Sequence, residues 1–383
     1  MRYKQISEVA DVQTGPFGSQ LHKDDYVSVG TPIVTVEHLG SRIFTEQNLP
    51  QVSDIDKARL SKYVLKEGDV VFSRVGSVDR CSYVDKNHDG WMFSGRCLRV
   101  RPYDVVDSLF LYYFFCLEKT KEHIRNIAVG ATMPSINTKL LGEIEIAIPK
   151  LETQQKIVAI LSSLDDKIEL NQKINYRLQQ QVQAIFKYWF ADGKEPNGFL
   201  VDICQFSKDR VAVSFLDLDN YYSTENMLPG KAGAIQATNL PTTAQTTGCK
   251  TGDVLISNIR PYFKKIVYCQ SDCGCSTDVL CFHPRTPSLS AYLFCTLYAD
   301  RFFDFMVAGS KGTKMPRGDK QQIMTYAVSL PSSDDLRKFN IVAVPILSAI
   351  EQNRRENKSL TELRDTLLPK LMSGEIDVSD IQT

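Results

Sequence analysis

A long internal repeat restricts the fold of this sequence more than any other feature. The segment Gly68 to Ser73 recurs as Gly252 to Ser257, 184 residues later. Three proline-containing pairs recur at an offset of 182: Arg101-Pro102 with His283-Pro284, Met133-Pro134 with Met315-Pro316, and Ile148-Pro149 with Leu330-Pro331. Because a solenoid unit spans only about 20 to 50 residues, this period indicates a duplicated domain and not a repeat array.

Both copies have the same order: a globular segment, a polar boundary and a long helical pattern. We expect globular segments over 1–150 and 192–332, long helices over 151–191 and 333–375, and a tail over 376–383. A chain of 383 residues is long enough for two or three domains, each with its own core.

Short β-type runs bounded by turn residues fill the globular part of the first copy. They are Thr31 to Val36, Gly68 to Phe72 and the alternating run Glu143 to Ile148. One helix is expected from Ser108 to Asn126, matched by Ser288 to Met306 in the second copy. The aromatic run Tyr112 to Phe115 inside it is typical of a core and not of a base-stacking surface.

The helical segments carry a heptad pattern, with apolar residues spaced alternately four and three apart. In the first segment the positions are Ile157, Leu161, Leu164, Ile168, Asn171, Asn175, Leu178, Val182, Ile185 and Trp189. Adding 182 to each gives Phe339, Ala343, Ile346, Ile350, Asn353, Asn357, Leu360, Arg364, Leu367 and Leu371. The repeated asparagines indicate that the helices pair with each other, because a buried Asn selects one register.

Two copies related by a pseudo-two-fold axis should place these helices antiparallel. Aligning their midpoints predicts that Asn171 faces Asn357 and that Asn175 faces Asn353. Pro345 should kink the second helix or delay its regular start. A helix of about 38 residues is about 57 Å long, so we interpret the pair as a rod that sets the separation of the two domains.

The composition limits the kinds of partner that this protein can bind. Lys plus Arg and Asp plus Glu are both 45, so any contact with nucleic acid must be local. The longest apolar run, from Leu109 to Leu117, is too short to span a membrane, and the first residues lack the pattern of a secretory signal. We therefore expect no membrane partner and a cytoplasmic location.

Ten cysteines in such a chain are expected to be reduced thiols. Cys269, Cys273, Cys275 and Cys281 lie close together, with His283 behind them. Their spacing lacks the two separated pairs of a structural zinc site. Free thiols are therefore favoured, and metal binding stays open.

Three motifs make the resemblance to a known family specific. They are Gly15-Pro16-Phe17-Gly18-Ser19-Gln20-Leu21, Gly68 to Arg74, and the run from Ile148 to Val158 that contains Gln154-Gln155. Over nearly the whole chain, the sequence resembles the specificity subunit of a type I restriction-modification system. The second copy departs from the pattern, because residues 330–338 lack the Gln-Gln pair and residues 204–214 lack the Gly-Pro-Phe-Gly run.

The resemblance implies an α+β protein in which two mixed α/β target recognition domains are separated by two long antiparallel coiled-coil helices. Each domain would read one half of an asymmetric double-stranded DNA target, and the helix pair would set the spacing and dock two methyltransferase subunits. Two restriction subunits could join the complex. The family's subunit is not a catalyst and holds no cofactor or metal, so S-adenosylmethionine, ATP and Mg are expected on the partners.

Candidate DNA-binding residues come from this motif and from basic or hydrogen-bonding loops. In the first domain they are Ser19, Gln20, Lys23, Arg74, Ser77, Arg80, Thr132, Asn137 and Lys139. In the second domain they are Asn258, Arg260, Lys264, Lys265, Lys311, Lys314, Arg317 and Lys320. Solvated loops and salt bridges at strand ends are the structural alternatives.

Catalytic motifs are absent from the sequence. There is no phosphate-binding G-x-x-x-x-G-K-[ST] loop, no H-E-x-x-H and no amino-methyltransferase motif. The triplets Asp165-Asp166-Lys167 and Glu356-Asn357-Lys358 fall within the heptad helices, where solvent-facing charges are expected. Two alternatives remain: a coiled-coil scaffold that binds proteins without reading DNA, and a nuclease or methyltransferase with an unrecognised motif.

Overall fold

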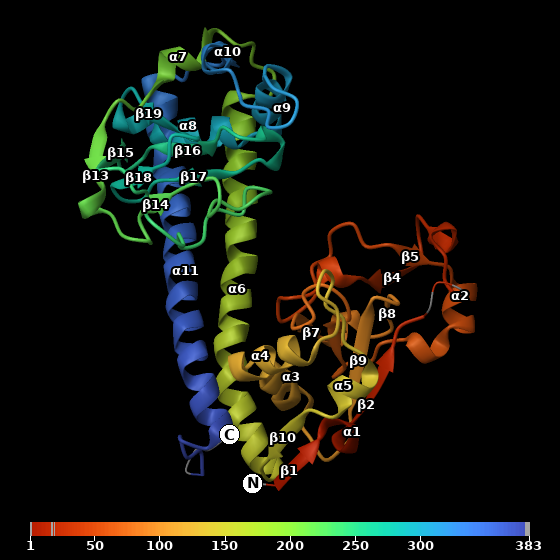
Figure 1. Ribbon diagram of the computed structural model, residues 1–383. Helices are drawn as coiled ribbons and strands as arrows, with labels where there is room; N and C mark the ends of the chain where they lie inside the picture. The colour runs from red at the N-terminus through yellow and green to blue at the C-terminus, as the bar shows by residue number, and fades with distance from the viewer. Residues whose placement is uncertain (1, 17, 19, 380–383) are drawn as a thin grey trace. The chain divides into compact units, whose positions relative to one another are not determined.

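The computed structural model describes residues 2–16, 18 and 20–379. Contacts divide the chain into two compact units: residues 1–169 with 358–383, and residues 170–357. Each unit combines one copy of the repeat with part of both long helices. These helices are α6 (Leu151–Phe190) and α11 (Ser333–Ser373), and their bounds lie within two residues of the expected ones (Figure 1).

The first unit is built on an antiparallel sheet with the strand order β2-β9-β6-β7. Its strands are β2 (Ala10–Thr14), β9 (Cys97–Pro102), β6 (Val70–Ser73) and β7 (Cys81–Tyr83). A smaller sheet has the order β3-β5-β4-β8, from β3 (Tyr26–Val27), β5 (Gln51–Val52), β4 (Thr31–Val34) and β8 (Met92–Phe93). β1 (Arg2–Gln5) pairs with β10 (Glu145–Ile148), so the start of the domain lies beside the strand that precedes α6.

The second unit repeats the main sheet as β12-β19-β16-β17, also antiparallel. Its strands are β12 (Cys204–Phe206), β19 (Val279–Pro284), β16 (Val254–Ser257) and β17 (Ile266–Tyr268). The smaller sheet is β13-β15-β18-β14, from β13 (Arg210–Ala212), β15 (Gln245–Cys249), β18 (Cys273–Cys275) and β14 (Tyr221–Tyr222). β11 (Gly198–Phe199) pairs with β20 (Ala327–Val328), as β1 pairs with β10.

Short helices complete each unit. The first unit has α1 (Ile6–Val9), α2 (Asp54–Arg59), α3 (Ser108–Cys116), α4 (Glu118–Ile127) and α5 (Thr138–Gly142). The second has α7 (Leu200–Ile203), α8 (Ser290–Tyr298), α9 (Asp300–Ala308) and α10 (Lys320–Met324). None of the helices in the described residues has an apolar stretch long enough to cross a bilayer.

The single helix expected in each globular segment is wrong in both copies. Leu117 separates α3 from α4, and Ala299 separates α8 from α9, because both residues have extended backbone with ψ of 130° and 139°. Charged residues follow both breaks, Glu118 with Lys119 and Asp300 with Arg301, but periodicity alone does not show where one helix ends and the next begins. The interpretation of Tyr112 to Phe115 as core is confirmed, since these side chains are at most 9% exposed.

The two long helices contribute to the core of each unit. In the first unit, Ile157 and Leu161 of α6 and Leu368 and Leu371 of α11 pack with α3 and the main sheet. In the second unit, residues of both helices that include Val182, Phe186 and Phe339 pack with α8. Helix stability in both units therefore comes from tertiary packing of one face.

Half-buried polar contacts fix the register of the helix pair within the second unit. Asn171 donates to Asn357 (2.8 Å), and Asn353 donates to Asn175 (2.8 Å). These are the two pairs that midpoint alignment predicts, and the helices are antiparallel. Slippage by one turn would separate both pairs, so the hydrogen bonds define one alignment.

The buried face of α6 differs in detail from the expected heptad positions. Asp165, Phe186 and Phe190 are at most 4% exposed, whereas the predicted neighbours Leu164 and Trp189 are only half-buried. A helix packed against domains as well as against a partner follows the 3.6-residue period, so the strict seven-residue pattern drifts. Of the two effects expected of Pro345, a kink or a delayed start, the delayed start is wrong, because α11 is helical from Ser333 through this proline.

Candidate nucleic-acid interface

Two loops of the first domain lie side by side because backbone hydrogen bonds join them. They are residues 74–80, between β6 and β7, and residues 128–137, which lead into α5. Val75 forms a bridge with Ser135, and the amide of Gly76 donates to the carbonyl of Pro134 (2.8 Å). We call these segments the first loop pair. It brings together candidates that are about sixty residues apart in sequence.

The second domain contains the same arrangement, formed by residues 258–265 and 309–319. Ile259 bridges Arg317, and the amide of Arg260 donates to the carbonyl of Pro316 (2.8 Å). We call these segments the second loop pair. Its bridges occupy the same repeat positions as those of the first pair, so the duplication preserves a backbone platform and not only the core.

In the loop of residues 74–80, two candidate arginines already bind acceptors within the domain. Arg74 lies 3.3 Å from both the Thr14 hydroxyl and the carbonyl of Gly95. Arg80 donates to the carbonyl of Leu39. Ser77 is exposed at the turn between them. The arginines therefore stabilise this loop, and Ser77 is available for a ligand.

The other loop of the first pair divides its candidates between structural and exposed positions. Asn137 caps α5, accepting a hydrogen bond from the amide of Leu140 (2.9 Å). Thr132 is exposed at the tip of the loop, and Lys139 is exposed 3.8 Å from Glu143. The Asn137 side chain is thus used by the helix, as the preference of Asn for N-caps predicts.

The candidates from the Gly-Pro-Phe-Gly motif are only partly described. Ser19 and the side chain of Lys23 lie outside the described residues. Gln20 is half-buried; its side-chain oxygen accepts from the hydroxyl of Tyr63 (2.7 Å) and its carbonyl from Arg59 (2.9 Å). These contacts join Gln20 to the smaller sheet region and not to the first loop pair.

Acidic residues partly neutralise the basic loop of the second pair. Lys311 binds Asp319, which also caps α10, and Arg317 binds Asp278 (3.0 Å). The ammonium of Lys311, followed by backbone amides of α10, lowers the pKa of Asp319. Because the side chains of Lys311 and Arg317 are 80% and 55% exposed, these pairs are weak enough for phosphates to replace them.

Lys314 and Lys320 extend this charge along the loop. Both are exposed, and Lys320 lies 5.8 Å from the ring centre of Phe206. No acidic partner of Lys314 is found among the described residues. Lys314 is therefore the clearest candidate for a phosphate contact.

Within the second loop pair, two polar side chains have unused hydrogen-bonding groups. The Oδ1 atom of Asn258 and the Nε atom of Arg260 are buried and have no partner within the described part of the chain. An unsatisfied buried polar atom costs about 1–3 kcal/mol, so such atoms are expected where a ligand completes the site. Asn258 and Arg260 therefore remain good candidates.

Lys264 and Lys265 are held by the second domain itself. Lys264 and Lys231 both bind Asp300, at 2.6 and 2.9 Å, and their hydrogen bonds lower the pKa of that carboxyl. Lys265 donates to the carbonyl of Thr224 (2.6 Å), and burial lowers its pKa. Their free charge is smaller than the sequence suggests, because the acceptors come from distant segments.

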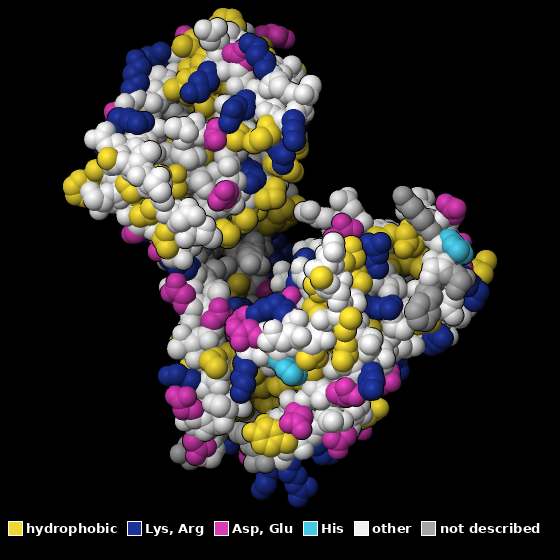
Figure 2. Space-filling view, in the orientation of Figure 1, with side chains coloured by type: hydrophobic (Ala, Val, Ile, Leu, Met, Phe, Trp, Pro, Cys, Tyr) yellow, Lys and Arg dark blue, Asp and Glu magenta, His cyan; other side chains and the backbone are white. Residues whose placement is uncertain are grey.

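The candidate set missed four exposed apolar side chains on these loops. Met133 and Met315 occupy equivalent tip positions and are 64% and 50% exposed. Tyr262 and Phe263 are 49% and 39% exposed. The sequence signal was available, since Tyr262 and Phe263 follow a proline between basic residues. On the face of the second unit in Figure 2, basic side chains are scattered among acidic and apolar ones and form no single basic patch.

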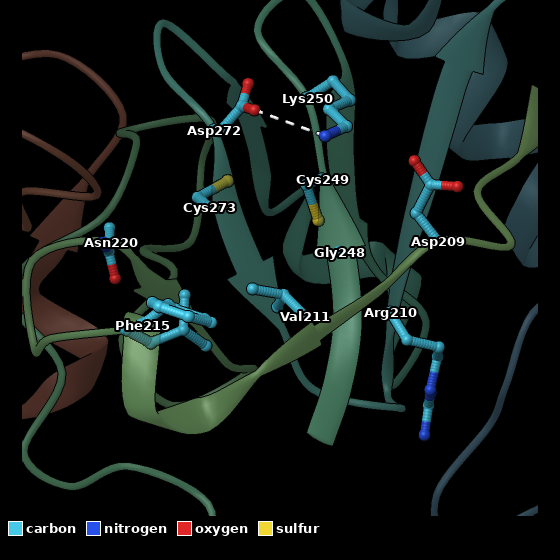
Figure 3. A pocket seen from close by; sticks show the side chains of 11 residues that line it. Asp209, Arg210, Val211, Phe215, Asn220, Gly248, Cys249, Lys250, Asp272 and Cys273 are labelled. Carbon is cyan, nitrogen blue, oxygen red and sulfur yellow. Dashed lines mark hydrogen bonds and ion pairs between the residues drawn. The ribbon is translucent and has the colours of Figure 1, made fainter. Parts of the chain in front are cut away.

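A cavity of about 310 Å³ lies elsewhere in the second unit, beside the smaller sheet (Figure 3). Val211 and Phe215 form an apolar side, and Lys250 pairs with Asp272 (3.4 Å) near the thiols of Cys249 and Cys273. Its balanced charges and buried thiols differ from the loop pairs, so we do not assign it to the DNA interface.

The cysteine cluster is larger than the sequence indicated. Cys249 joins Cys269, Cys273, Cys275 and Cys281 in one buried core, and the sulfurs of Cys269 and Cys273 are 3.6 Å apart. All ten cysteines are free thiols. In the described residues no group of three or more His, Cys, Asp or Glu side chains has a geometry that could hold a metal ion.

Comparison with known proteins gives results that agree with this geometry. Residues 1–180 match the family model described as the type I restriction modification DNA specificity domain. The type I restriction enzyme HindI specificity subunit of Haemophilus influenzae is 36% identical over 136 residues, 34% of this chain and 30% of that protein. The MjaIX specificity subunit of Methanocaldococcus jannaschii is 26% identical over 320 residues, covering 73% and 72% of the two chains.

A solved structure supports the fold. The S subunit of a type I restriction-modification system from M. genitalium has a TM-score of 0.57 and 18% identity, with 97% of this chain and 95% of that chain covered. The duplicated sheet domains and the two long helices of this chain therefore form an α+β fold that this S subunit shares. The match of residues 1–180 to the DNA specificity domain and the two similar proteins point to the specificity subunits of type I restriction-modification systems.

Proposed function

We propose that this chain is the DNA sequence-recognition subunit of a type I restriction-modification complex. Each globular domain reads one half of a bipartite, asymmetric target in double-stranded DNA. The observation that carries this proposal is the duplicated loop pair, in which the same bridges, Val75 with Ser135 and Ile259 with Arg317, hold different side chains. A fixed platform with variable side chains suits two half-sites of different sequence.

The helix pair sets the distance between the half-sites and docks two methyltransferase subunits. The cross-helix asparagines support a fixed spacing, because they permit one register. An apolar groove beside α11, lined by residues that include Leu336, Ile341 and Val344, supports a protein contact. Ile341 and Val344 are 66% and 44% exposed, as expected for a surface that a partner covers.

Catalysis belongs to the partners in this proposal. The methyltransferase subunits bind S-adenosylmethionine, and two restriction subunits, where they are present, use ATP and Mg. The complex acts on DNA in the cytoplasm. The lack of catalytic motifs in the sequence supports this division.

Methylome sequencing of cells that express this chain with its methyltransferase tests the proposal. We expect a split, non-palindromic motif with one modified adenine on each strand. Exchanging residues 309–319 should change one half of the motif and leave the other unchanged. The scaffold alternative predicts that the complex binds no DNA at any salt concentration, and activity of the isolated chain with metal or S-adenosylmethionine would indicate an enzyme instead.

A further inference from the structure

The second loop pair presents two adjacent aromatic rings to solvent. Tyr262 and Phe263 lie on a 3₁₀ turn, Pro261–Phe263, and their ring centres are 4.8 Å apart at an angle of 56°. Their exposed fractions are 49% and 39%, and Met315 on the neighbouring loop is 50% exposed. Exposed apolar side chains grouped in this way mark a surface that binds something.

The turn that carries the rings is held firmly. Arg260 and Lys264, on either side, have left-handed backbone with φ of 51°, which side chains other than glycine rarely adopt. The amide of Phe263 donates to the carbonyl of Arg260 (2.9 Å), and the amide of Gly230 donates to the carbonyl of Phe263 (2.8 Å). Strained backbone fixed from both sides is typical of a functional turn, and rigid rings lose little entropy on binding.

The charges around the rings favour a nucleic acid over a protein as the ligand. Arg260 flanks the turn on one side and Lys264, which is paired with Asp300, flanks it on the other, and Lys314 lies exposed on the paired loop. Cores of protein–protein interfaces are depleted in lysine. Aromatic side chains between basic ones suit DNA, because the phosphates meet the cations and the rings meet the faces of the bases.

The first domain lacks this feature at the equivalent place. The loop of residues 74–80 is one residue shorter. It carries Val78, which is 1% exposed, and Asp79, which binds Arg125 (2.6 Å). The ring pair is therefore an addition to the shared platform and not part of it.

We propose that Tyr262 and Phe263 form a wedge that enters the base stack of DNA in the half-site read by the second domain. Tyr262, the more exposed ring, inserts between neighbouring base pairs, and Phe263 supports it from behind. This inference rests on the proposed function and adds a second mode of recognition to it. Because pyrimidine–purine steps unstack most easily, that half-site should contain a TA or CA step at the wedge.

The test uses the full chain assembled with its methyltransferase and a duplex of the target found by methylome sequencing. 2-Aminopurine is placed at successive positions in both half-sites, and its fluorescence is read on binding. A base extruded for methylation would give a signal in both halves. We expect an additional rise at one step in the second domain's half-site only.

Three variants separate the wedge from other roles. Tyr262→Ala should abolish the additional signal and weaken binding about 5- to 100-fold, the range for losing one base-stacking ring. Tyr262→Phe should keep both the signal and the affinity. Phe215→Ala is the matched control and should change neither, because Phe215 is an 80% exposed ring beside the cavity and away from the second loop pair.

Different failures have different meanings. If the wild-type complex binds no DNA, the proposed function is wrong. If it binds its target but shows no additional signal, or if Tyr262→Ala keeps both signal and affinity, the wedge is wrong and the proposed function stands. If Tyr262→Ala instead prevents assembly with the methyltransferase, the rings form a protein contact and the inference is overturned.

Discussion

The two units build equivalent helix crossings from different chemistry. In the first unit Arg364 donates to the buried carboxylate of Asp165 (2.8 Å), which also accepts from the hydroxyl of Tyr113 (2.7 Å). At the positions related by the repeat, the second unit has Val182 and Leu347, both buried in its apolar core. The same backbone geometry thus accepts an ionic network or an apolar contact, so the network is not required for the crossing itself.

A second difference lies under the main sheets. Asp69 is 1% exposed and accepts two hydrogen bonds from Arg101, both 2.7 Å long. Its equivalent, Asp253, is fully buried and accepts from His283 (2.7 Å), from the thiol of Cys281 (3.2 Å) and from a backbone amide. The buried carboxylate is kept because it ties the turn before the strand, while its partners change.

The loop pairs differ most in charge. Lys311, Lys314 and Arg317 in the second domain replace Val129, Thr132 and Ser135 in the first. Because the bridges between the loops are the same, the substitutions change what a ligand meets without moving the platform. The two copies therefore retain the same backbone arrangement of the loops, whereas the side chains that the loops present to a ligand have diverged.

The largest expected effect tests the helix crossing of the first unit. Arg364→Val should lower the free energy of unfolding of that unit by about 3–5 kcal/mol, because it leaves Asp165 buried without its cation. The double variant Asp165→Leu with Arg364→Val copies the second unit and should recover most of the loss. Hydrogen exchange of peptides from each unit measures the change. Equal losses in both variants would show that the network is essential.

The next largest effect on stability is expected at the two buried aspartates, Asp69 and Asp253. Arg101→Ala should destabilise the first unit by about 3 kcal/mol, since it removes two charge-assisted hydrogen bonds from a buried carboxylate. His283→Ala should cost the second unit only about 1–2 kcal/mol, because Asp253 keeps its other donors. Denaturant titration, with unfolding of each unit followed by hydrogen exchange, compares the loss of stability in the two variants. A larger loss for His283→Ala than for Arg101→Ala would contradict the view that the other donors of Asp253 compensate for the lost histidine.

The charge difference between the loop pairs predicts different salt dependence. Lys314→Ala should weaken DNA binding about three- to tenfold and reduce the slope of log affinity against log salt by about 0.9, the value for one lost phosphate contact. Thr132→Ala, its counterpart in the first domain, should leave the slope unchanged. Binding titrations of the assembled complex at several salt concentrations measure the slope for each variant. An unchanged slope for Lys314→Ala would exclude it as a phosphate ligand.

The smallest effect concerns acid stability of the second unit. Hydrogen bonds from Lys231 and Lys264 lower the pKa of Asp300 below its ordinary value of 3.8. The stabilisation is therefore present above pH 3.8 and is lost as the pH falls through the lower folded value. Since the side chain is 66% exposed, Asp300→Asn should cost less than about 1 kcal/mol at pH 6, and the cost should shrink as the pH falls below 3.8. A loss of stability that does not depend on pH would contradict the ion-pair explanation.

Local patterns predicted the larger elements well. The repeat located both main-sheet domains, and the asparagines at 171 and 175 identified the helix register, because both signals depend on spacing along the chain. The breaks at Leu117 and Ala299 escaped prediction, because the spacing of apolar residues does not show where one helix ends and the next begins. The choice of Asp165 over Leu164 as a buried position also escaped, because packing against Tyr113 and Arg364 decides it.

The candidate site was predicted in composition but not in arrangement. The sequence identified the basic loop of residues 309–319 and the residues after β16 as separate candidates. Their pairing through Ile259 and Arg317 is set by tertiary contacts between distant segments. Tyr262 and Phe263 were missed although they follow a proline between basic residues, and the fold shows that both rings are exposed.

The sequence by itself determined that this protein is a duplicated design with two paired helices in one register, because heptad spacing and repeated asparagines are properties of the linear chain. Only the tertiary structure decided which charges remain free for a ligand. Lys264, Lys311 and Arg317 are partly neutralised by Asp300, Asp319 and Asp278, and two of these three acids lie more than thirty residues away from their partners. Electrostatic strength depends on distance in space, which folding alone establishes.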